Sequence, residues 1–203
     1  MKANERNSRR IISRSIAMAL VSILAFGCAG DYARQQAKRY YHQGQALVNR
    51  GETERAVKKF EKSMYLSEKT GFSAGIAHNL NELAIIHTHR KEYETARSEL
   101  ARALKIYRSL DMQPEASKTM NNIVQTYLGE RRFEEAIEHY QMLIAWDEKT
   151  SNRLGMALSY RNMAFIYERQ LGNLSKAREA YERYLEISQE PEVNQYLQHL
   201  QEK

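Results

Sequence analysis

The chain has 203 residues, of which 42% are hydrophobic and only two are proline, so it can bury a core and favours helix over most of its length. Its formal net charge is +6, but the first 27 residues hold five Lys and Arg against one Glu, which leaves +2 for residues 28–203. Binding to nucleic acid needs a concentrated basic face, and this small residual charge argues against nucleic acid as a partner. The single cysteine excludes an internal disulfide.

The first segment in chain order has the layout of an export signal. Five basic residues up to Arg14 precede an uncharged apolar run over residues 16–27. A membrane-spanning helix needs about 20 apolar residues, so this run is short for a span and fits the apolar core of a secretory signal peptide. It ends in Leu24-Ala25-Phe26-Gly27-Cys28, which resembles the lipobox of bacterial lipoprotein precursors.

The lipobox resemblance implies that residues 1–27 are cleaved off and that Cys28 becomes lipidated, with residues 28–36 as a short tether. Several acyl chains anchor a protein almost permanently, because each buried CH₂ contributes about 0.8 kcal/mol. Ala29 follows the cysteine, which by analogy with enteric bacteria predicts the outer membrane, facing the periplasm of the cell envelope. Two alternatives remain open, namely an ordinary cleaved signal and an uncleaved anchor with an incidental cysteine.

A pattern of a small residue followed four positions later by a large one recurs through the rest of the chain. Its steps are 40, 40 and 41 residues, and it reads Ala56 with Phe60, Ala96 with Leu100, Ala136 with Tyr140, and Ala177 with Tyr181. A second set of positions keeps the same phase and begins 16 or 17 residues before these alanines; its small members, 12 or 13 residues before them, are Gly44, Ala84, Val124 and Ala164. Spacings of three and four place each set on one helical face. Eight helices are therefore expected, over residues 33–49, 53–69, 73–89, 92–110, 114–129, 133–150, 153–170 and 174–189.

Four units in one phase exclude a plain helical bundle, which would not keep a 40-residue register. The pattern resembles the tetratricopeptide repeat, in the longer form found in kinesin light chains. That resemblance implies an all-α solenoid, a right-handed superhelix of helix-turn-helix repeats. The repeats by phase are 37–76, 77–116, 117–156 and 157–190, and after Pro191 residues 191–203 are expected to form a C-terminal capping helix.

The sequence contains no constellation typical of an enzyme. HExxH, CxxC and Gly-rich phosphate-binding motifs are absent, and the GxSxG match at residues 71–75 follows an expected helix instead of the strand that a nucleophile elbow requires. His78 and Glu82 are four residues apart on one helix, but a structural zinc site takes four ligands. We therefore predict no catalysis, no cofactor, no metal site and no small-molecule substrate.

In the resembling family the first helix of each repeat lines the concave face, so its inward positions are candidates for a peptide-binding groove. Amide side chains recur there at 40-residue steps and offer both donors and acceptors to the backbone of an extended peptide. Two alternatives remain, because these side chains can also line a hydrated groove or bond the neighbouring helix and so order the repeats. The candidates are Tyr41, Gln45, His78, Asn81, Glu82, Lys118, Asn121, Asn122, Gln125, Arg161, Asn162 and Phe165.

The function expected from these features is that of a membrane-anchored scaffold that holds protein or peptide partners during assembly of the cell envelope, such as pilus, secretion, outer-membrane or cell-wall machinery. The alternative is a cytoplasmic regulatory or sensor module of the same repeat type, which requires the N-terminal segment to be no export signal.

Overall fold

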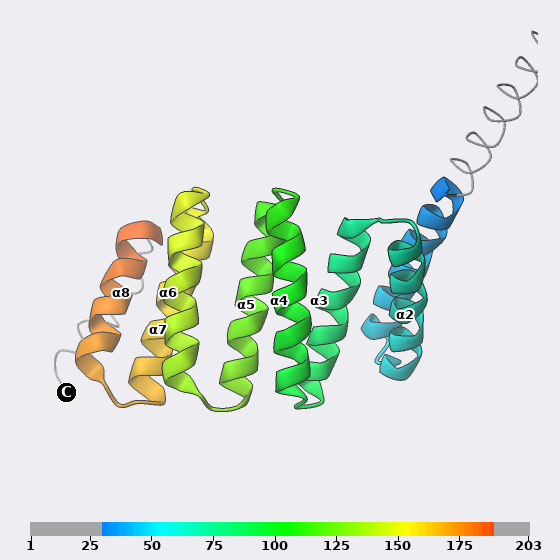
Figure 1. Cartoon of the computed structure of the whole chain (residues 1–203). Helices are drawn as coiled ribbons and strands as arrows, with labels where there is room; N and C mark the ends of the chain where they lie inside the picture. Colours follow the sequence, from blue (N-terminus) through cyan, green and yellow to red (C-terminus); the bar gives the residue numbers. More distant parts are fainter. Residues whose placement is uncertain (1–29, 189–203) are drawn as a thin grey trace, which may run out of the picture. The chain divides into compact units, whose positions relative to one another are not determined.

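The structure is a computed structural model that describes residues 30–188, and these residues contain helices and turns but no strand (Figure 1). A helix over residues 30–49 comes first. The others are α2 (Thr53–Lys69), α3 (Ser73–His89), α4 (Tyr93–Ser109), α5 (Gln113–Gly129), α6 (Phe133–Lys149), α7 (Arg153–Arg169) and α8 (Leu174–Ser188). These bounds confirm the eight expected helices to within one residue, except that the first helix begins three residues earlier. The predicted signal peptide, Cys28 and the predicted capping helix lie outside the described residues.

Each turn between helices contains one residue with a left-handed backbone. These residues recur at intervals of 20 or 21, and they are Gly51, Gly71, Lys91, Asp111, Arg131, Ser151 and Gly172, with φ between 54° and 75°. In the first turn the amide of Glu52 donates to the carbonyl of Leu47 at 2.9 Å, which closes the end of the helix over residues 30–49. This cap reverses the chain within three residues, so the next helix starts in the opposite direction.

The chain forms two compact units, which divide between Ile76 and Ala77. In the first unit, the helix over residues 30–49 packs against α2 where Gly44 faces Phe60. A Cβ atom on Gly44 would lie 2.5 Å from the Phe60 ring, so only glycine allows this approach. Ala56 and Phe60 have no exposed surface, and the Ser63 hydroxyl donates to the carbonyl of Ala37 at 2.8 Å. This pair of helices therefore has its own core.

In the second unit, each helix from α4 to α8 contacts the next in the chain (Figure 1). The small residues predicted at the close contacts are fully buried, at 0% exposure in every case: Ala84, Ala96, Val124, Ala136, Ala164 and Ala177. Larger side chains of the same phase, including Leu100 and Tyr140, fill the space beside them and are also buried. The 40-residue period therefore sets the positions of the core.

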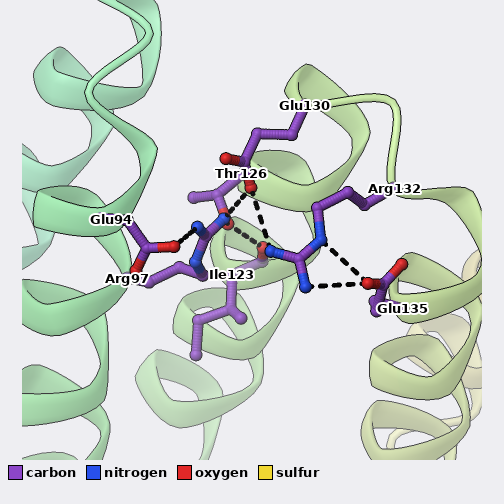
Figure 2. Close-up of polar contacts among 7 residues, drawn as sticks. All are labelled: Glu94, Arg97, Ile123, Thr126, Glu130, Arg132 and Glu135. Carbon is purple, nitrogen blue, oxygen red and sulfur yellow. Dashed lines mark hydrogen bonds and ion pairs between the residues drawn. The ribbon is translucent and has the colours of Figure 1, made fainter.

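A network of charges joins α4, α5 and the start of α6 (Figure 2). The Arg97 guanidinium lies between Glu94 and Glu130, and Arg132 continues the network to Glu130 at 3.6 Å and Glu135 at 2.8 Å. Both guanidinium groups also lie over the ring of Tyr127, at 4.8 and 5.0 Å from its centroid. Isolated surface ion pairs contribute little, but here the Arg97 side chain is only 11% exposed and packs on an aromatic ring. The network therefore holds the second and third repeats together.

Asp147 of α6 is a carboxylate with no exposed surface. Its Oδ1 accepts hydrogen bonds from the Ser117 hydroxyl at 2.8 Å and from Nδ2 of Asn152 at 2.9 Å, whereas its Oδ2 has no hydrogen-bond partner. Burial raises the pKa of Asp147 above its ordinary value, and the two hydrogen bonds oppose this shift only in part. The charged form of this side chain is therefore less favourable in the folded protein than in the unfolded chain.

We predict that Asp147→Asn raises the melting temperature at pH 7 by about 2–4 °C, since it removes a poorly solvated charge and keeps the oxygen that accepts both hydrogen bonds. Because the folded pKa is raised, the stability that Asp147 contributes falls as the pH rises from the unfolded pKa through the folded one. The gain should therefore shrink toward pH 4 in thermal melts followed by circular dichroism. Glu148→Gln, at an exposed neighbour, is the control, and a lower melting temperature of Asp147→Asn at pH 7 would contradict the prediction.

Candidate functional site

The first helices of the second unit carry two adjoining hollows that share Gln125 and Leu128 of α5. One hollow lies between α3 and α5 and has a volume of about 610 Å³. The other lies between α5 and α7 and has a volume of about 320 Å³. Because they share residues of one helix, they form a single groove across three successive repeats. The lining of this inner groove is Ile85, Thr88, His89, Lys91, Tyr93, Asn122, Gln125, Leu128, Gly129, Phe133, Tyr140, Asn162, Phe165, Ile166 and Gln170.

The repeat phase explains why these side chains meet. Ile85, Gln125 and Phe165 are 40 residues apart and occupy the same position on α3, α5 and α7. Tyr93 and Phe133 are also 40 apart, and each begins the second helix of its repeat. Equivalent positions of successive repeats lie side by side, so five residues scattered over 80 positions line one surface.

The inner groove is apolar with amide groups and carries no carboxylate among its lining residues. Phe165 is 53% exposed, although a large aromatic ring gains free energy when it is buried. His89 and Lys91 are the basic side chains of the lining, and both are exposed. The surface therefore suits a neutral or acidic segment that brings bulky apolar side chains.

Tyr140 fixes the amide groups on the floor of this groove. Its side chain is 1% exposed, and its hydroxyl is hydrogen-bonded by the side chains of Asn162 and Gln125. Burial raises the pKa of Tyr140, so the hydroxyl is neutral at physiological pH. These bonds hold Gln125 of α5 and Asn162 of α7 in defined orientations before a ligand arrives.

The Asn81 amide, in contrast, joins two repeats. Asn81 is 6% exposed, and its Oδ1 accepts hydrogen bonds from the Thr119 hydroxyl at 3.2 Å and from Nδ2 of Asn122 at 3.0 Å. Both donors belong to α5, whereas Asn81 belongs to α3. For this pair the structure favours the alternative that polar residues of the first helices order the repeats.

The other candidates of the second unit differ in their surroundings. Nδ1 of His78 is hydrogen-bonded to the Tyr107 hydroxyl at 2.8 Å, and burial lowers the pKa of His78, so the ring is neutral at pH 7. Glu82 and Asn121 are half-buried, whereas Lys118 and Arg161 are exposed. None of these five residues lines the inner groove.

Tyr41 and Gln45 belong to the first unit. Nε2 of Gln45 donates to the Tyr41 hydroxyl at 3.0 Å, and the Tyr41 ring packs against Phe60 with 5.8 Å between centroids. Oε1 of Gln45 also contacts Nδ1 of His42 at 3.2 Å. These two candidates therefore form a local polar cluster on one helix.

Several groove residues were missing from the predicted set. Leu128, Tyr93 and Phe133 were not expected there, and Tyr140 was expected only as the large member of a repeated pair. Leu128 could have been found, because it lies three positions after Gln125 on the same helical face. The Tyr93 and Phe133 positions carried a weaker signal, namely aromatic residues 40 apart at the start of second helices.

Within the part of the chain that the structure describes, no group of three His, Cys, Asp or Glu residues is placed to hold a metal ion. No helix in residues 30–188 combines the length and apolar character that a membrane span needs.

Stacked helix pairs with an inner groove define a helical repeat protein of the kind that holds other proteins. Models of the tetratricopeptide repeat match residues 37–70, 77–110 and 115–190, together most of the chain. The chain belongs to the tetratricopeptide repeat family, whose fold typically serves as a non-enzymatic scaffold for protein–protein interaction.

Solved structures show the same fold. BtubC (BKLC) from P. vanneervenii is 18% identical, with a TM-score of 0.66 over 75% of this chain, and this chain spans 63% of its length. Repeats of a putative kinesin light chain from P. anserina are 20% identical, with a TM-score of 0.61 over 75% of this chain and 74% of that one. A second structure of those repeats has a TM-score of 0.62 at 18% identity, over 83% of this chain and 92% of that one. A search of curated proteins gave no match.

We predict that Asn81→Ala lowers the free energy of unfolding by about 1–2 kcal/mol, because Nδ2 of Asn122 on α5 loses its buried acceptor, whereas the Thr119 hydroxyl keeps its bond to the Glu115 carbonyl. Asn121→Ala is the matched control, since Asn121 holds the equivalent position one repeat later and is half-buried, and its effect should stay within about 0.5 kcal/mol. Urea denaturation of both variants measures the difference. Equal destabilisation would show that the bond between α3 and α5 has no special role.

Proposed function

We propose that this protein is a lipid-anchored scaffold of the bacterial cell envelope that holds a segment of a partner protein in the inner groove of its second unit. The observation that carries the proposal is the groove itself, with an exposed apolar ring, Phe165, beside amides that Tyr140 holds in place. Grooves of this kind bind by burying apolar anchors while fixed polar groups set the orientation of the ligand. Membership of a family of interaction scaffolds supports it.

The chemistry of the inner groove defines the partner. Leu128 and Phe165 offer apolar contact, whereas Gln125, Asn162 and Gln170 can bond a peptide backbone. The lining residues include no carboxylate that could pair with a basic segment. Electrostatics therefore favours neutral or acidic segments. The partner is therefore an extended or helical segment with large apolar side chains, and neither nucleic acid nor a small-molecule substrate is part of the proposal.

The anchor rests on the N-terminal sequence. Basic residues, an apolar run and Cys28 follow each other in the order that a lipoprotein signal requires. Acylation of Cys28 would place the scaffold at the outer membrane, facing the periplasm, where envelope machinery is assembled. The alternative is a cytoplasmic regulatory module with the same groove, for which residues 1–27 are no export signal.

The groove is tested with a photo-crosslinking amino acid in place of Gln125, which both hollows share. We predict that a protein adduct forms in cells and that Phe165→Ser reduces its yield about tenfold, because a buried aromatic anchor contributes about 1.5–3 kcal/mol.

Met142→Ser is the matched control, since Met142 is 49% exposed on α6 and lies outside the inner groove. Its adduct yield should equal that of the parent. Equal loss in both variants, or no loss in either, would refute the groove as the binding face.

The anchor is tested by labelling cells with palmitate. The parent chain should incorporate the label and Cys28→Ser should not, because the diacylglyceryl group that carries the fatty acids is attached through the cysteine sulfur. Globomycin, which blocks the lipoprotein signal peptidase, should cause an unprocessed precursor to accumulate. If the chain incorporates no palmitate and globomycin causes no precursor to accumulate, the cytoplasmic alternative is favoured.

A further inference from the structure

The first unit has an open groove of its own, with a volume of about 700 Å³, between the helix over residues 30–49 and α2. Its aromatic residues include Tyr32 and Tyr65, which are 65% and 63% exposed. Exposed tyrosines of this size are unusual in a protein whose other tyrosines are mostly packed. The complete lining of this N-terminal face is Tyr32, Ala33, Gln36, Tyr40, Lys58, Glu61, Lys62, Tyr65 and Leu66.

The repeat phase shows what kind of face this is. Tyr40 is equivalent to Met120, which is 7% exposed and is contacted by the Arg108 guanidinium of the preceding repeat at 3.5 Å. The Tyr40 position therefore belongs to the side of a repeat on which the preceding repeat packs. In the first unit the Tyr40 ring is half-buried. The ammonium groups of Lys59 and Lys62 lie above it, at 5.2 and 5.9 Å from its centroid. The position that is interior in the later repeat, at Met120, is therefore part of an aromatic and cationic surface in the first unit, at Tyr40.

Charge is unevenly divided along the described chain. Residues 30–76 contain nine Lys and Arg against five Asp and Glu, a net charge of +4, whereas residues 77–188 contain 16 of each kind and are neutral. On the N-terminal face, Lys58 and Lys62 outnumber the single carboxylate, Glu61. The first unit therefore attracts anionic surfaces, and the second has no net attraction for them.

The N-terminal face also begins next to the proposed anchor. The described part of the first helix begins at residue 30, two positions after Cys28, and two steps of fully extended chain span at most about 7 Å. Tyr32 lies only about 3 Å further along the helix axis. Tyr65 and Leu66, near the end of α2, line the same groove as Tyr32. Tyrosines favour the depth of lipid headgroups, and lysines are attracted to anionic lipids.

We propose that the N-terminal face rests on the anionic lipid surface that holds Cys28, so that the first repeat faces the membrane. Tyr32 and Tyr65 lie at headgroup depth, and Lys58 and Lys62 pair with lipid phosphates. The inference rests on the lipid anchor in the proposed function and extends it. Acyl chains at Cys28 alone would leave the first unit free to rotate relative to the membrane. A docked first unit restricts the orientation of the tethered protein.

The test uses the acylated protein purified from membranes, in which an introduced cysteine carries the only free thiol. Glu61→Cys places that thiol within the N-terminal face and keeps its tyrosines and lysines. Ala101→Cys is the matched control, an exposed position 40 residues later. Each variant is reconstituted in vesicles of phosphatidylcholine, with or without about 30% phosphatidylglycerol, and labelled with a water-soluble maleimide, because the surface charge of anionic lipids attracts lysine.

The expected result is that phosphatidylglycerol slows labelling of Glu61→Cys about 25-fold and leaves Ala101→Cys unchanged, because each of the two lysines near an anionic surface contributes about a fivefold preference. Lys58→Glu with Lys62→Glu should remove the protection, whereas Arg102→Glu with Lys105→Glu, the same change of charge one repeat later, should keep it.

The remaining outcomes separate the inference from the anchor. If the protein is acylated but its Glu61→Cys thiol reacts as fast as the Ala101→Cys thiol, the proposed contact of the N-terminal face with the membrane is wrong and the lipid anchor is retained. Protection that is equal in neutral vesicles or in detergent indicates a protein occupant, such as a second copy of this chain, and also overturns it. A protein that carries no acyl chain and remains in the soluble fraction overturns both.

Discussion

The structure depends on one close contact between helices, made at a small residue. In the first unit Gly44 lies against the Phe60 ring, and the later helix pairs use Ala84, Val124 and Ala164, which have no exposed surface. A larger side chain at such a point would separate the helices, and a well-packed core tolerates such overpacking poorly. Because this contact recurs every 40 residues, it fixes the spacing of the repeats and therefore the positions at which their surface residues meet.

Polar side chains between the repeats add to this packing in different ways. Asn81 accepts hydrogen bonds from two donors of the next first helix, and Arg97 connects carboxylates of α4 and α5 beside the Tyr127 ring. Asp147 accepts two hydrogen bonds but leaves one buried oxygen without a partner. Buried polar groups are costly unless they are satisfied, so they favour one relative position of neighbouring helices over others. A solenoid with such contacts presents a groove of defined shape.

The two units have different roles in the proposed function. The second unit is neutral and carries the inner groove, in which Phe165 is exposed and the amides of Gln125 and Asn162 are fixed by Tyr140. The first unit is basic and presents tyrosines and lysines next to the predicted lipid anchor. A scaffold tethered by one end needs a surface for its membrane and a surface for its partner. The distribution of charge gives each surface a different preference.

The sequence by itself determined the repeat. Ala56, Ala96, Ala136 and Ala177 with their large partners identified the all-α solenoid, its eight helices and most of their ends, because the spacing of helical faces is a local property that periodicity records. The resemblance to the family predicted which face of each first helix points inward, and among those candidates Gln125, Asn162 and Phe165 line a hollow of the structure.

Only the tertiary structure decided which of those inward residues remain available to a ligand. Asn81 and Asn121 are equivalent in the sequence pattern, yet Asn81 is bonded to α5 and nearly buried, whereas Asn121 is half-buried. Tyr93, Phe133 and Leu128 joined the groove because second helices and neighbouring repeats bring them beside α5. Hydrogen bonds and hollows arise between residues that are about 40 positions apart, and their geometry depends on how the helices pack. A one-dimensional pattern records the period of that packing but not its distances.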